Sequence, residues 1–387
     1  MKEELITLFE QKFGTGGDIR CYFSPGRVNL IGEHTDYNGG HVFPCALTLG
    51  TYLIARKRGD KKLRFYSKNF HDAGILEGSL EHLVWNREAG WTNYPMGVMW
   101  AMKEKGYSIS NGFDILLYGN IPNGSGLSSS ASVEVGIGVM LNDMYEFGID
   151  MVNLALIGQY AENHFNQVQC GIMDQFAIAM GKKDHAIFLD TATLSYTYAP
   201  LVLDSHKIVI ACSNKKRELA DSKYNERRTE CMAALSEIKE FIGIHSLCEL
   251  TGQQFELYKT AILDETWLKR ARHAIYENQR TITAVEVLKS HDLKTFGMLM
   301  TASHNSLKDD YEVTGRELDT LVEAALEQNG VLGSRMTGAG FGGCTISLVE
   351  NESIPSFIEN VGTKYLDTIG YAADFYVAEI GDGARRI

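Results

Sequence analysis

The stretch Ile121-Pro122-Asn123-Gly124-Ser125-Gly126-Leu127-Ser128-Ser129-Ser130-Ala131 joins an apolar run to a helical pattern. Phe113 to Tyr118 reads as a strand, and Ser128 to Tyr145 reads as a helix opened by serines. Where a strand turns through glycines into a helix, unpaired amides and the helix dipole make an anion site. Three serines exceed the need of one helix cap, so phosphate binding is favoured over a plain capped turn.

Strands and helices continue on both sides of this turn. Apolar patterns predict strands at Arg20–Phe23, Leu47–Arg56, Leu63–Ser67, Ala186–Leu189, Lys207–Cys212 and Thr345–Val349. They predict helices at Trp91–Lys105, Met151–Phe165, Asp221–Ile242 and Trp267–Lys289. A chain of 387 residues exceeds the usual single core, and its composition becomes mainly helical near residue 190. We therefore expect two lobes, residues 1–190 and 191–387.

A second segment, SPGRVNLIGEHTDYNGG (residues 24–40), reads as a glycine-rich loop between strands. It carries four charged or titratable side chains, Arg27, Glu33, His34 and Asp36. By composition alone a solvated surface loop is the commoner interpretation. The functional interpretation is a sugar-binding loop, because acidic side chains accept hydrogen bonds from hydroxyls and an arginine can neutralise a phosphate.

A third segment, MTGAGFGGC (residues 336–344), contains G-x-G-x-x-G. A strand pattern follows it instead of a helix, which excludes the dinucleotide-binding fingerprint. The chain also lacks the Walker A ending and the HRD and DFG tripeptides of protein kinases. What is left is a loop whose backbone can approach a ligand or another segment closely. A further short motif holds Asp174, which by base rate would be a helix N-cap.

Composition limits the classes of function. The net charge of −12 argues against general binding to nucleic acid or anionic membranes. Seven cysteines without a CxxC pair indicate reduced, mostly buried thiols, and the absence of HExxH argues against zinc. Acidic residues at the N-terminus do not suit a signal peptide, and the apolar runs are too short to span a bilayer, so we expect a cytoplasmic protein.

Taken in this order, the segments resemble those of the GHMP small-molecule kinases. The P-x-G-x-G-L-S-S-S-A element and the late glycine-rich loop are shared across that superfamily, and residues 26–40 are similar to the galactokinase signature without a departure. The resemblance covers nearly the whole chain. It implies an α+β fold of two mixed α/β lobes with the active site between them. It also implies transfer of the γ-phosphate of ATP to the C1 hydroxyl of galactose.

The resemblance implies roles for individual residues. Arg27 would stabilise the transferring phosphoryl group, and Asp174 would orient and deprotonate the sugar hydroxyl. The expected sugar-binding residues are Glu33, His34, Thr35, Asp36, Gly171 and Tyr224. The expected ATP-binding residues are Ser67, Trp91, Gly124, Ser125, Gly126, Leu127, Ser128, Ser129 and Ser130. Mg²⁺ would bind Ser130 and Glu162. The expected partners are galactose and ATP, with no nucleic acid or membrane, and the expected state is a monomer.

Two alternatives stay open at this point. The chain could be a kinase of the same superfamily acting on another sugar, such as N-acetylgalactosamine or arabinose. It could instead be a galactose- and ATP-binding regulator without turnover, since fold alone does not decide function. Retention of Ser128 to Ala131 and of Asp174 argues against the regulator. Whether Asp174 acts as a true base or as an orienting acceptor is also open.

Overall fold

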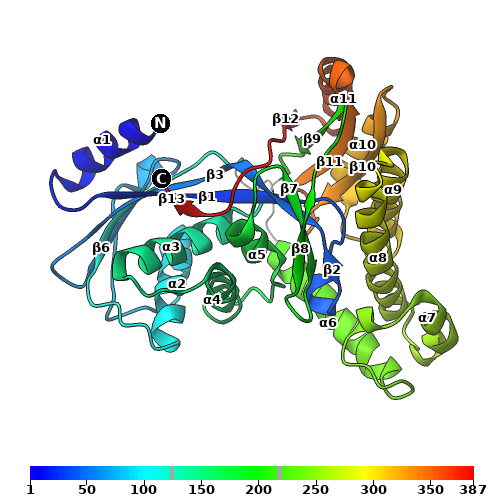
Figure 1. The fold of residues 1–387 in the computed structure, drawn as a ribbon, viewed down its shortest axis with the longest axis horizontal. Helices are drawn as coiled ribbons and strands as arrows, with labels where there is room; N and C mark the ends of the chain where they lie inside the picture. Colours follow the sequence, from blue (N-terminus) through cyan, green and yellow to red (C-terminus); the bar gives the residue numbers. More distant parts are fainter. Residues whose placement is uncertain (123–125, 216–219) are drawn as a thin grey trace.

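The computed structural model describes residues 1–122, 126–215 and 220–387 (Figure 1). Its α-helices in these ranges are α1 (Lys2–Phe13), α2 (Asn93–Glu104), α3 (Ser129–Tyr145), α4 (Met151–His164), α5 (Met173–Met180), α6 (Ala220–Ile238), α7 (Gly252–Tyr258), α8 (Glu265–Lys289), α9 (Leu293–Asp309), α10 (Gly315–Leu326) and α11 (Ile354–Ile369). Within the same ranges, no helix is both long and apolar enough to cross a membrane.

In the part of the chain that the structure describes, the strands form three sheets. One has the order β13-β1-β3-β6-β4-β5, one β10-β11-β9-β12, and one β2-β7-β8. The strands of the first sheet are β1 (Arg20–Asn29), β3 (Pro44–Lys57), β4 (Lys62–Ser67), β5 (Leu76–Ser79), β6 (Phe113–Gly119) and β13 (Arg385–Arg386). The others are β2 (His41–Val42), β7 (His185–Asp190), β8 (Tyr196–Pro200), β9 (His206–Cys212), β10 (Val331–Thr337), β11 (Cys344–Glu350) and β12 (Asp374–Val377).

The first sheet carries helices on both faces. Its larger core packs against α2, α3, α4 and α5, which lie together beneath the sheet in Figure 1. Helix α1 covers the other face through Leu5, Phe9 and Phe13. β4 and β6 pair in parallel, whereas the remaining pairs of this sheet are antiparallel. Helix α3 follows β6 along the chain, as the strand–turn–helix pattern predicts.

The other half of the molecule is built on the β10-β11-β9-β12 sheet. Helices α8 and α9 contribute to the core on one face, and α10 and α11 cover the other. Figure 1 shows these helices grouped at the opposite end of the molecule from α1. The chain then returns, since β13 pairs with β1 and Lys2 Nζ donates to the Ile387 carbonyl at 2.8 Å. The predicted division into residues 1–190 and 191–387 did not anticipate that the end of the chain returns to the first sheet. Where the two lobes divide stays a prediction.

The predicted strands and helices named above are present, with ends shifted by a few residues. One assignment within residues 24–40 was wrong, because β1 continues to Asn29 and places Arg27 on a strand rather than on a loop. The register shifts between Pro25 and Arg27. A bulge tolerates a proline that cannot donate to the ladder, so the Pro-Gly pair did not end the strand. A Cβ on Gly26 would lie 2.8 Å from the Leu127 carbonyl oxygen, which explains the glycine.

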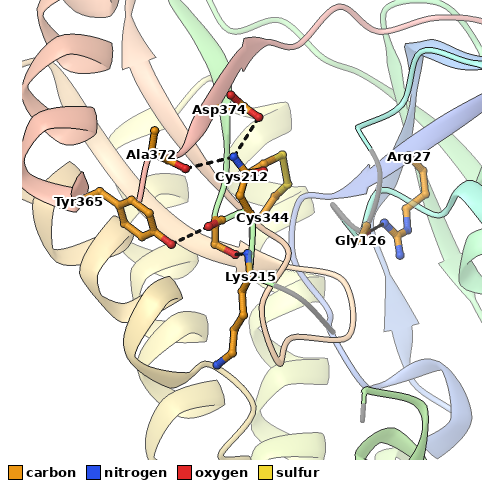
Figure 2. Close-up of a disulfide and its surroundings, with 10 residues drawn as sticks. Arg27, Gly126, Cys212, Lys215, Cys344, Tyr365, Ala372 and Asp374 are labelled. Atoms are coloured by element: carbon orange, nitrogen blue, oxygen red, sulfur yellow. Dashed lines mark hydrogen bonds between the residues drawn. A yellow bond between two sulfur atoms is a disulfide. The ribbon is translucent and has the colours of Figure 1, made fainter. Parts of the chain in front are cut away.

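The expectation that all seven cysteines are reduced was wrong for two of them. Cys212 and Cys344 form a disulfide in the structure (Figure 2). They are 132 residues apart in sequence but directly opposite each other on β9 and β11, with their Cα atoms 4.1 Å apart. Spacing along the chain could not show this, because strand register alone brings the two sulfurs together. The other five are free thiols.

Candidate active site

A cavity of about 210 Å³ lies where the three predicted segments meet. It is lined by residues of β1, α2, α4, α5 and α6, by the start of α3, and by the segments that follow β1 and β10. Its walls contain most of the residues predicted from the sequence. These are Arg27, Glu33, His34, Asp36, Gly126, Ser128, Ser129, Ser130, Glu162, Gly171, Asp174 and Tyr224.

Arg27 and Asp174 form the charged centre of this cavity. Arg27 Nε and Nη2 each donate to one carboxylate oxygen of Asp174 at 2.8 Å, which is a bidentate pair. Ser128 Oγ donates to the same carboxylate at 2.5 Å, and Arg27 Nη1 donates to the Gly126 carbonyl at 2.8 Å. The Arg27 side chain is 3% exposed and that of Asp174 is 31% exposed. A buried guanidinium thus holds a carboxylate that still faces the cavity.

The interpretation of Asp174 as a helix N-cap was wrong. Helix α5 begins at Met173, its N-cap is Ile172, and no side chain caps it. Ser128 does occupy the N-cap of α3, but in a left-handed conformation with φ of 64° and without a capping bond. Its hydroxyl is used on Asp174 instead. Strained backbone that frees a polar side chain for a cluster is a common feature of functional sites.

Asp36 and Gly171 are fitted to each other. A Cβ on Gly171 would lie 1.9 Å from Asp36 Oδ2, so no other residue type fits there without moving the carboxylate. Asp36 accepts from the backbone amides of Tyr37 at 3.0 Å and Met173 at 3.3 Å. Burial and the nearby charge of Asp174 raise the pKa of Asp36 to about 6.

Glu33 is enclosed by donors from both halves of the molecule. Its carboxylate accepts from Asn29 Nδ2 at 2.8 Å and from the Gly338 amide at 2.9 Å. Arg335, on β10, approaches it at 2.5 Å with a fully buried guanidinium. Burial raises the pKa of Glu33, while Arg335 acts in the opposite direction. Glu33 therefore links the segment after β1 to the glycine-rich loop that follows β10.

His34 and Tyr224 form an aromatic wall of the cavity. Their ring centroids are 5.6 Å apart, and Tyr224 comes from α6. His34 Nδ1 lies 2.8 Å from Tyr37 Oη, and Nε2 lies 3.2 Å from the Ala339 carbonyl oxygen. Burial and His273 lower the pKa of His34 to about 3, so the ring is neutral near pH 7. Both ring nitrogens are therefore engaged within the protein.

Ser130 and Glu162 line the same cavity as the Arg27–Asp174 pair. They offer a hydroxyl and a carboxylate, which are the hard oxygen ligands that Mg²⁺ prefers. Glu134, on α3, hydrogen-bonds to Glu162 from behind, and burial together with the Glu162 carboxylate raises its pKa well above the usual range. Among the described residues, no group of three or more His, Cys, Asp or Glu could hold a metal. The two oxygens fit a Mg²⁺ ion that also binds phosphates and water.

Four predicted site residues that the structure describes, Thr35, Ser67, Trp91 and Leu127, lie outside the cavity wall. Gly124 and Ser125 fall outside the described residues. Thr35 is fully buried, with its hydroxyl facing the carbonyls of Gly32 and His41, and Leu127 is buried in the core. Ser67 ends β4 and is buried, and Trp91 packs on Phe65 with ring centroids 6.1 Å apart. The Trp91 indole nitrogen is buried, and no hydrogen-bond partner for it is present in the described part of the chain.

Several cavity residues were not predicted as site residues. They are Tyr94, Val168, Cys170, Met173, Gln175, Gly338 and Ala339. Gly338 and Ala339 belong to the glycine-rich loop, whose G-x-G-x-x-G pattern signalled close backbone approach without a named role. Cys170, Met173 and Gln175 flank Gly171 and Asp174, so proximity to those two was the only sequence signal available. Arg335 and Glu134 had no such signal, because both are buried behind the cavity wall.

Comparisons with known proteins agree along the chain. The galactokinase galactose-binding signature matches residues 7–57, the GHMP kinases N terminal domain matches 93–182, and the GHMP kinases C terminal domain matches 284–367. A galactokinase of Clostridium acetobutylicum is 59% identical over 99% of this chain and 100% of the relative. One of Enterococcus faecalis is 55% identical over 100% of both.

Solved structures agree as well. The galactokinase of Lactococcus lactis complexed with galactose superposes with a TM-score of 0.98, at 48% identity and over 100% of both chains. The mevalonate kinase of Methanococcus jannaschii has a TM-score of 0.65 at 19% identity, over 95% of this chain and 99% of that one, and shows the shared fold alone.

Proposed function

The chain belongs to the galactokinase family of the GHMP kinases, and we propose from that premise how its residues divide the reaction between them. The reaction transfers the γ-phosphate of ATP to the C1 hydroxyl of galactose, which gives galactose 1-phosphate and ADP. The predicted activity and the predicted family are confirmed. The roles of single residues are the proposal, and the geometry of the cavity supports them.

The Arg27–Asp174 pair carries the chemical step in this proposal. The C1 hydroxyl attacks the γ-phosphorus, the bond to the β–γ bridging oxygen breaks, and ADP leaves with that electron pair. Asp174 accepts a hydrogen bond from the attacking hydroxyl and takes its proton, since its carboxylate is the exposed member of the pair. Arg27 neutralises charge on the transferring group, because its guanidinium is buried and fixed by three hydrogen bonds.

Asp36, Glu33, His34 and Tyr224 shape the sugar side of the cavity. Asp36 keeps acceptor capacity beyond its two backbone donors and faces the cavity beside Gly171. A carboxylate in this position discriminates by hydroxyl pattern, because a buried acceptor without a donor costs free energy. Glu33 lies on the same wall. Thr35 supports the segment from inside rather than contacting the sugar, as its buried hydroxyl indicates.

The N-terminus of α3 is the proposed phosphate site. Gly126, Ser128, Ser129 and Ser130 line the cavity there, beside the unpaired amides of the helix start. Ser130 and Glu162 are the proposed holders of Mg²⁺, which would neutralise phosphate charge when bound. The adenine side is proposed at Trp91, whose ring would pack against the base as the family resemblance implies, with Ser67 two residues after its packing partner Phe65.

The Arg27–Asp174–Ser128 cluster is the observation that carries this proposal. It joins three segments more than forty residues apart into one charge-balanced centre. The test is coupled ADP release across galactose, N-acetylgalactosamine and arabinose. We expect fast turnover on galactose. Preference for another sugar would favour the first alternative above, and sugar binding without ADP release would favour the regulator.

We also infer a cytoplasmic location, because the reaction consumes ATP. Weak affinity for nucleic acid and anionic membranes is expected from the net charge of −12. The monomeric state stays a prediction, which sedimentation equilibrium can test.

A further inference from the structure

We propose that Tyr37 is a positioning residue: its hydroxyl donates to Nδ1 of His34 and holds the imidazole ring, whose Nε2–H then holds Ala339 and the glycine-rich loop in place beside Arg27. Tyr37 follows Asp36 directly but contributes nothing to the cavity wall itself. The inference rests on the site proposed above only for its kinetic readout. Its spectroscopic readout is independent of that site.

The direction of hydrogen bonding at His34 follows from one acceptor. His34 Nε2 lies 3.2 Å from the Ala339 carbonyl oxygen, which can only accept, so Nε2 carries the proton. The ring is buried and its pKa is lowered to about 3, so Nδ1 has no proton near pH 7. Nδ1 must then accept, and the group at 2.8 Å is the Tyr37 hydroxyl. Tyr37 therefore donates to His34.

The donors and acceptors of the next hydrogen bonds follow in the same way. Since the Tyr37 hydrogen is used on His34, Tyr311 Oη at 2.7 Å is the donor to Tyr37. Cys231 Sγ, 3.0 Å from Tyr311 Oη, is then the donor to Tyr311, and Asn38 Nδ2 donates to that sulfur at 3.7 Å. Each of the three hydroxyl and thiol groups receives one hydrogen and gives one. The row of hydrogen bonds from Cys231 through Tyr311 and Tyr37 to His34 thus has a single self-consistent direction of donation.

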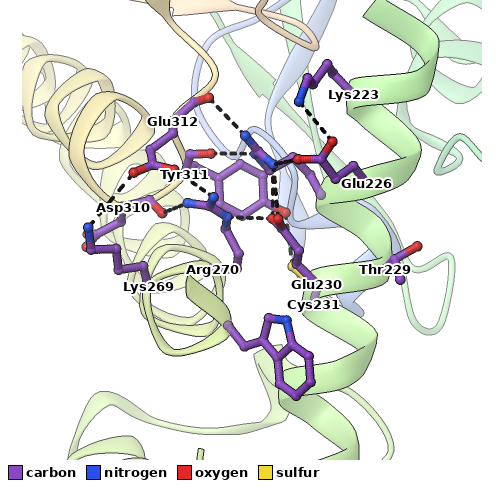
Figure 3. A network of polar contacts seen from close by, with 12 residues as sticks. Lys223, Glu226, Thr229, Glu230, Cys231, Lys269, Arg270, Asp310, Tyr311 and Glu312 are labelled. Carbon is purple, nitrogen blue, oxygen red and sulfur yellow. Dashed lines mark hydrogen bonds and ion pairs between the residues drawn. The ribbon is translucent and has the colours of Figure 1, made fainter. Parts of the chain in front are cut away.

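Tyr311 and Cys231, at one end of this row of hydrogen bonds, are held in place by the surrounding side chains. Figure 3 shows Tyr311 and Cys231 inside a network of ion pairs between α6, α8 and the segment after α9. Arg270 is 2% exposed and pairs with Glu230 and Glu312, both at 2.7 Å. Arg227 Nε donates to the Tyr311 carbonyl at 2.8 Å. The Tyr311 hydroxyl is therefore presented to Tyr37 from a fixed position.

At the other end of this row, His34 contacts the glycine-rich loop beside Arg27. The Gly338 amide donates to Glu33, and the Phe341 amide donates to the Val313 carbonyl at 2.7 Å, so His34 holds the loop between these two anchors. A Cβ on Gly338 would lie 2.9 Å from the Gly126 carbonyl oxygen and 3.5 Å from Arg27 Nη2. The loop backbone at Gly338 thus lies close to the guanidinium, with no room for a side chain at this position. A shift at Ala339 would alter the space beside Arg27.

Tyr37→Phe tests the proposal because it keeps the ring that lies 5.4 Å from Tyr224 and removes only the hydroxyl. His34 Nδ1 then loses its donor, while the Ala339 carbonyl still requires the proton on Nε2, so the ring keeps its tautomer but loses the hydrogen bond that holds it. We expect turnover to fall about tenfold, the effect of one lost hydrogen bond on alignment, with KM for galactose changed less than about threefold. Tyr365→Phe is the matched control, since Tyr365 is fully buried and its hydroxyl donates to the Ser213 carbonyl at 2.7 Å.

The spectroscopic readout is ¹⁵N NMR of the histidine rings, with the His34 signals assigned from a His34→Gln spectrum. We expect the Nε2–H tautomer in both proteins, and in Tyr37→Phe a downfield shift of the unprotonated Nδ1 signal, because that nitrogen has lost its hydrogen-bond donor. A wild-type Nδ1–H tautomer overturns the proposal, and this result does not depend on any variant folding. Unchanged turnover in Tyr37→Phe, reduced turnover with an unchanged Nδ1 signal, or an equal loss in Tyr365→Phe would also overturn it. Absence of galactose turnover in the wild type would instead refute the proposed function, which the NMR result does not touch.

Discussion

Replacing Asp174 with asparagine separates catalysis from structure at the charged centre. The side chain keeps its volume and one acceptor oxygen, but Arg27 now has one acceptor where it had two at 2.8 Å. The guanidinium is 3% exposed, so water cannot fully replace the lost partner. An unsatisfied hydrogen bond to a buried charged group costs about 1–3 kcal/mol of stability. Loss of the proton acceptor should lower turnover by about 10²–10⁴.

Asp143→Asn is the matched control for this variant. Asp143 is 29% exposed and accepts from Arg20 Nη1 at 2.9 Å, from Tyr22 Oη at 2.7 Å and from Arg386 Nη1 at 3.4 Å, so it also binds arginine and one hydroxyl, outside the cavity. We expect a comparable loss of stability in both variants and a loss of turnover only in Asp174→Asn. Thermal unfolding and galactose-dependent ADP release measure the two effects. A folded Asp174→Asn protein that keeps more than about a tenth of wild-type turnover would refute the reasoning.

Three further predictions follow from the same cavity. Gly171→Ala would place a Cβ 1.9 Å from Asp36 Oδ2, so KM for galactose should rise at least about tenfold while KM for ATP stays unchanged; equal sugar KM in steady-state kinetics would contradict this. Because the pKa of Asp36 is raised to about 6, the group is neutral below that pH and ionised above it, and kcat/KM for galactose should fall as pH drops through about 6; a wild-type profile that is flat there would contradict the assignment. Glu162→Gln and Ser130→Ala should each need more Mg²⁺ for half-maximal rate, while calorimetry shows galactose binding preserved; an unchanged Mg²⁺ titration would remove that residue from the metal site.

Much of the fold was predictable because its signals are local. The strand, glycine turn and serine-led helix at 113–145 follow from residues that contact one another along the chain, and the structure has β6 and α3 there. The length of β1 was not predictable in the same way. Pro25 and Gly26 are loop-forming residues in isolation, and only the pairing of β1 with β3 turns them into a bulge within a strand.

The partners of the site residues were decided by packing rather than by pattern. Arg27 and Asp174 are 147 residues apart, and nothing along the chain marks them as a bidentate pair. Gly171 was expected in the site from the resemblance, but nothing along the chain indicated that the Asp36 carboxylate lies 1.9 Å from where its Cβ would be. The disulfide between Cys212 and Cys344 depends on the register of β9 and β11 alone.

The sequence by itself determined the family, the reaction, and most of the residues that line the cavity. Those rest on short motifs whose chemistry depends on residue type and neighbouring order. The tertiary structure alone decided which donor meets which acceptor, including the direction of donation along the hydrogen bonds from Cys231 to Ala339. The physical reason is that hydrogen bonds and van der Waals contacts act over a few ångströms in space, whatever the separation of the residues along the chain.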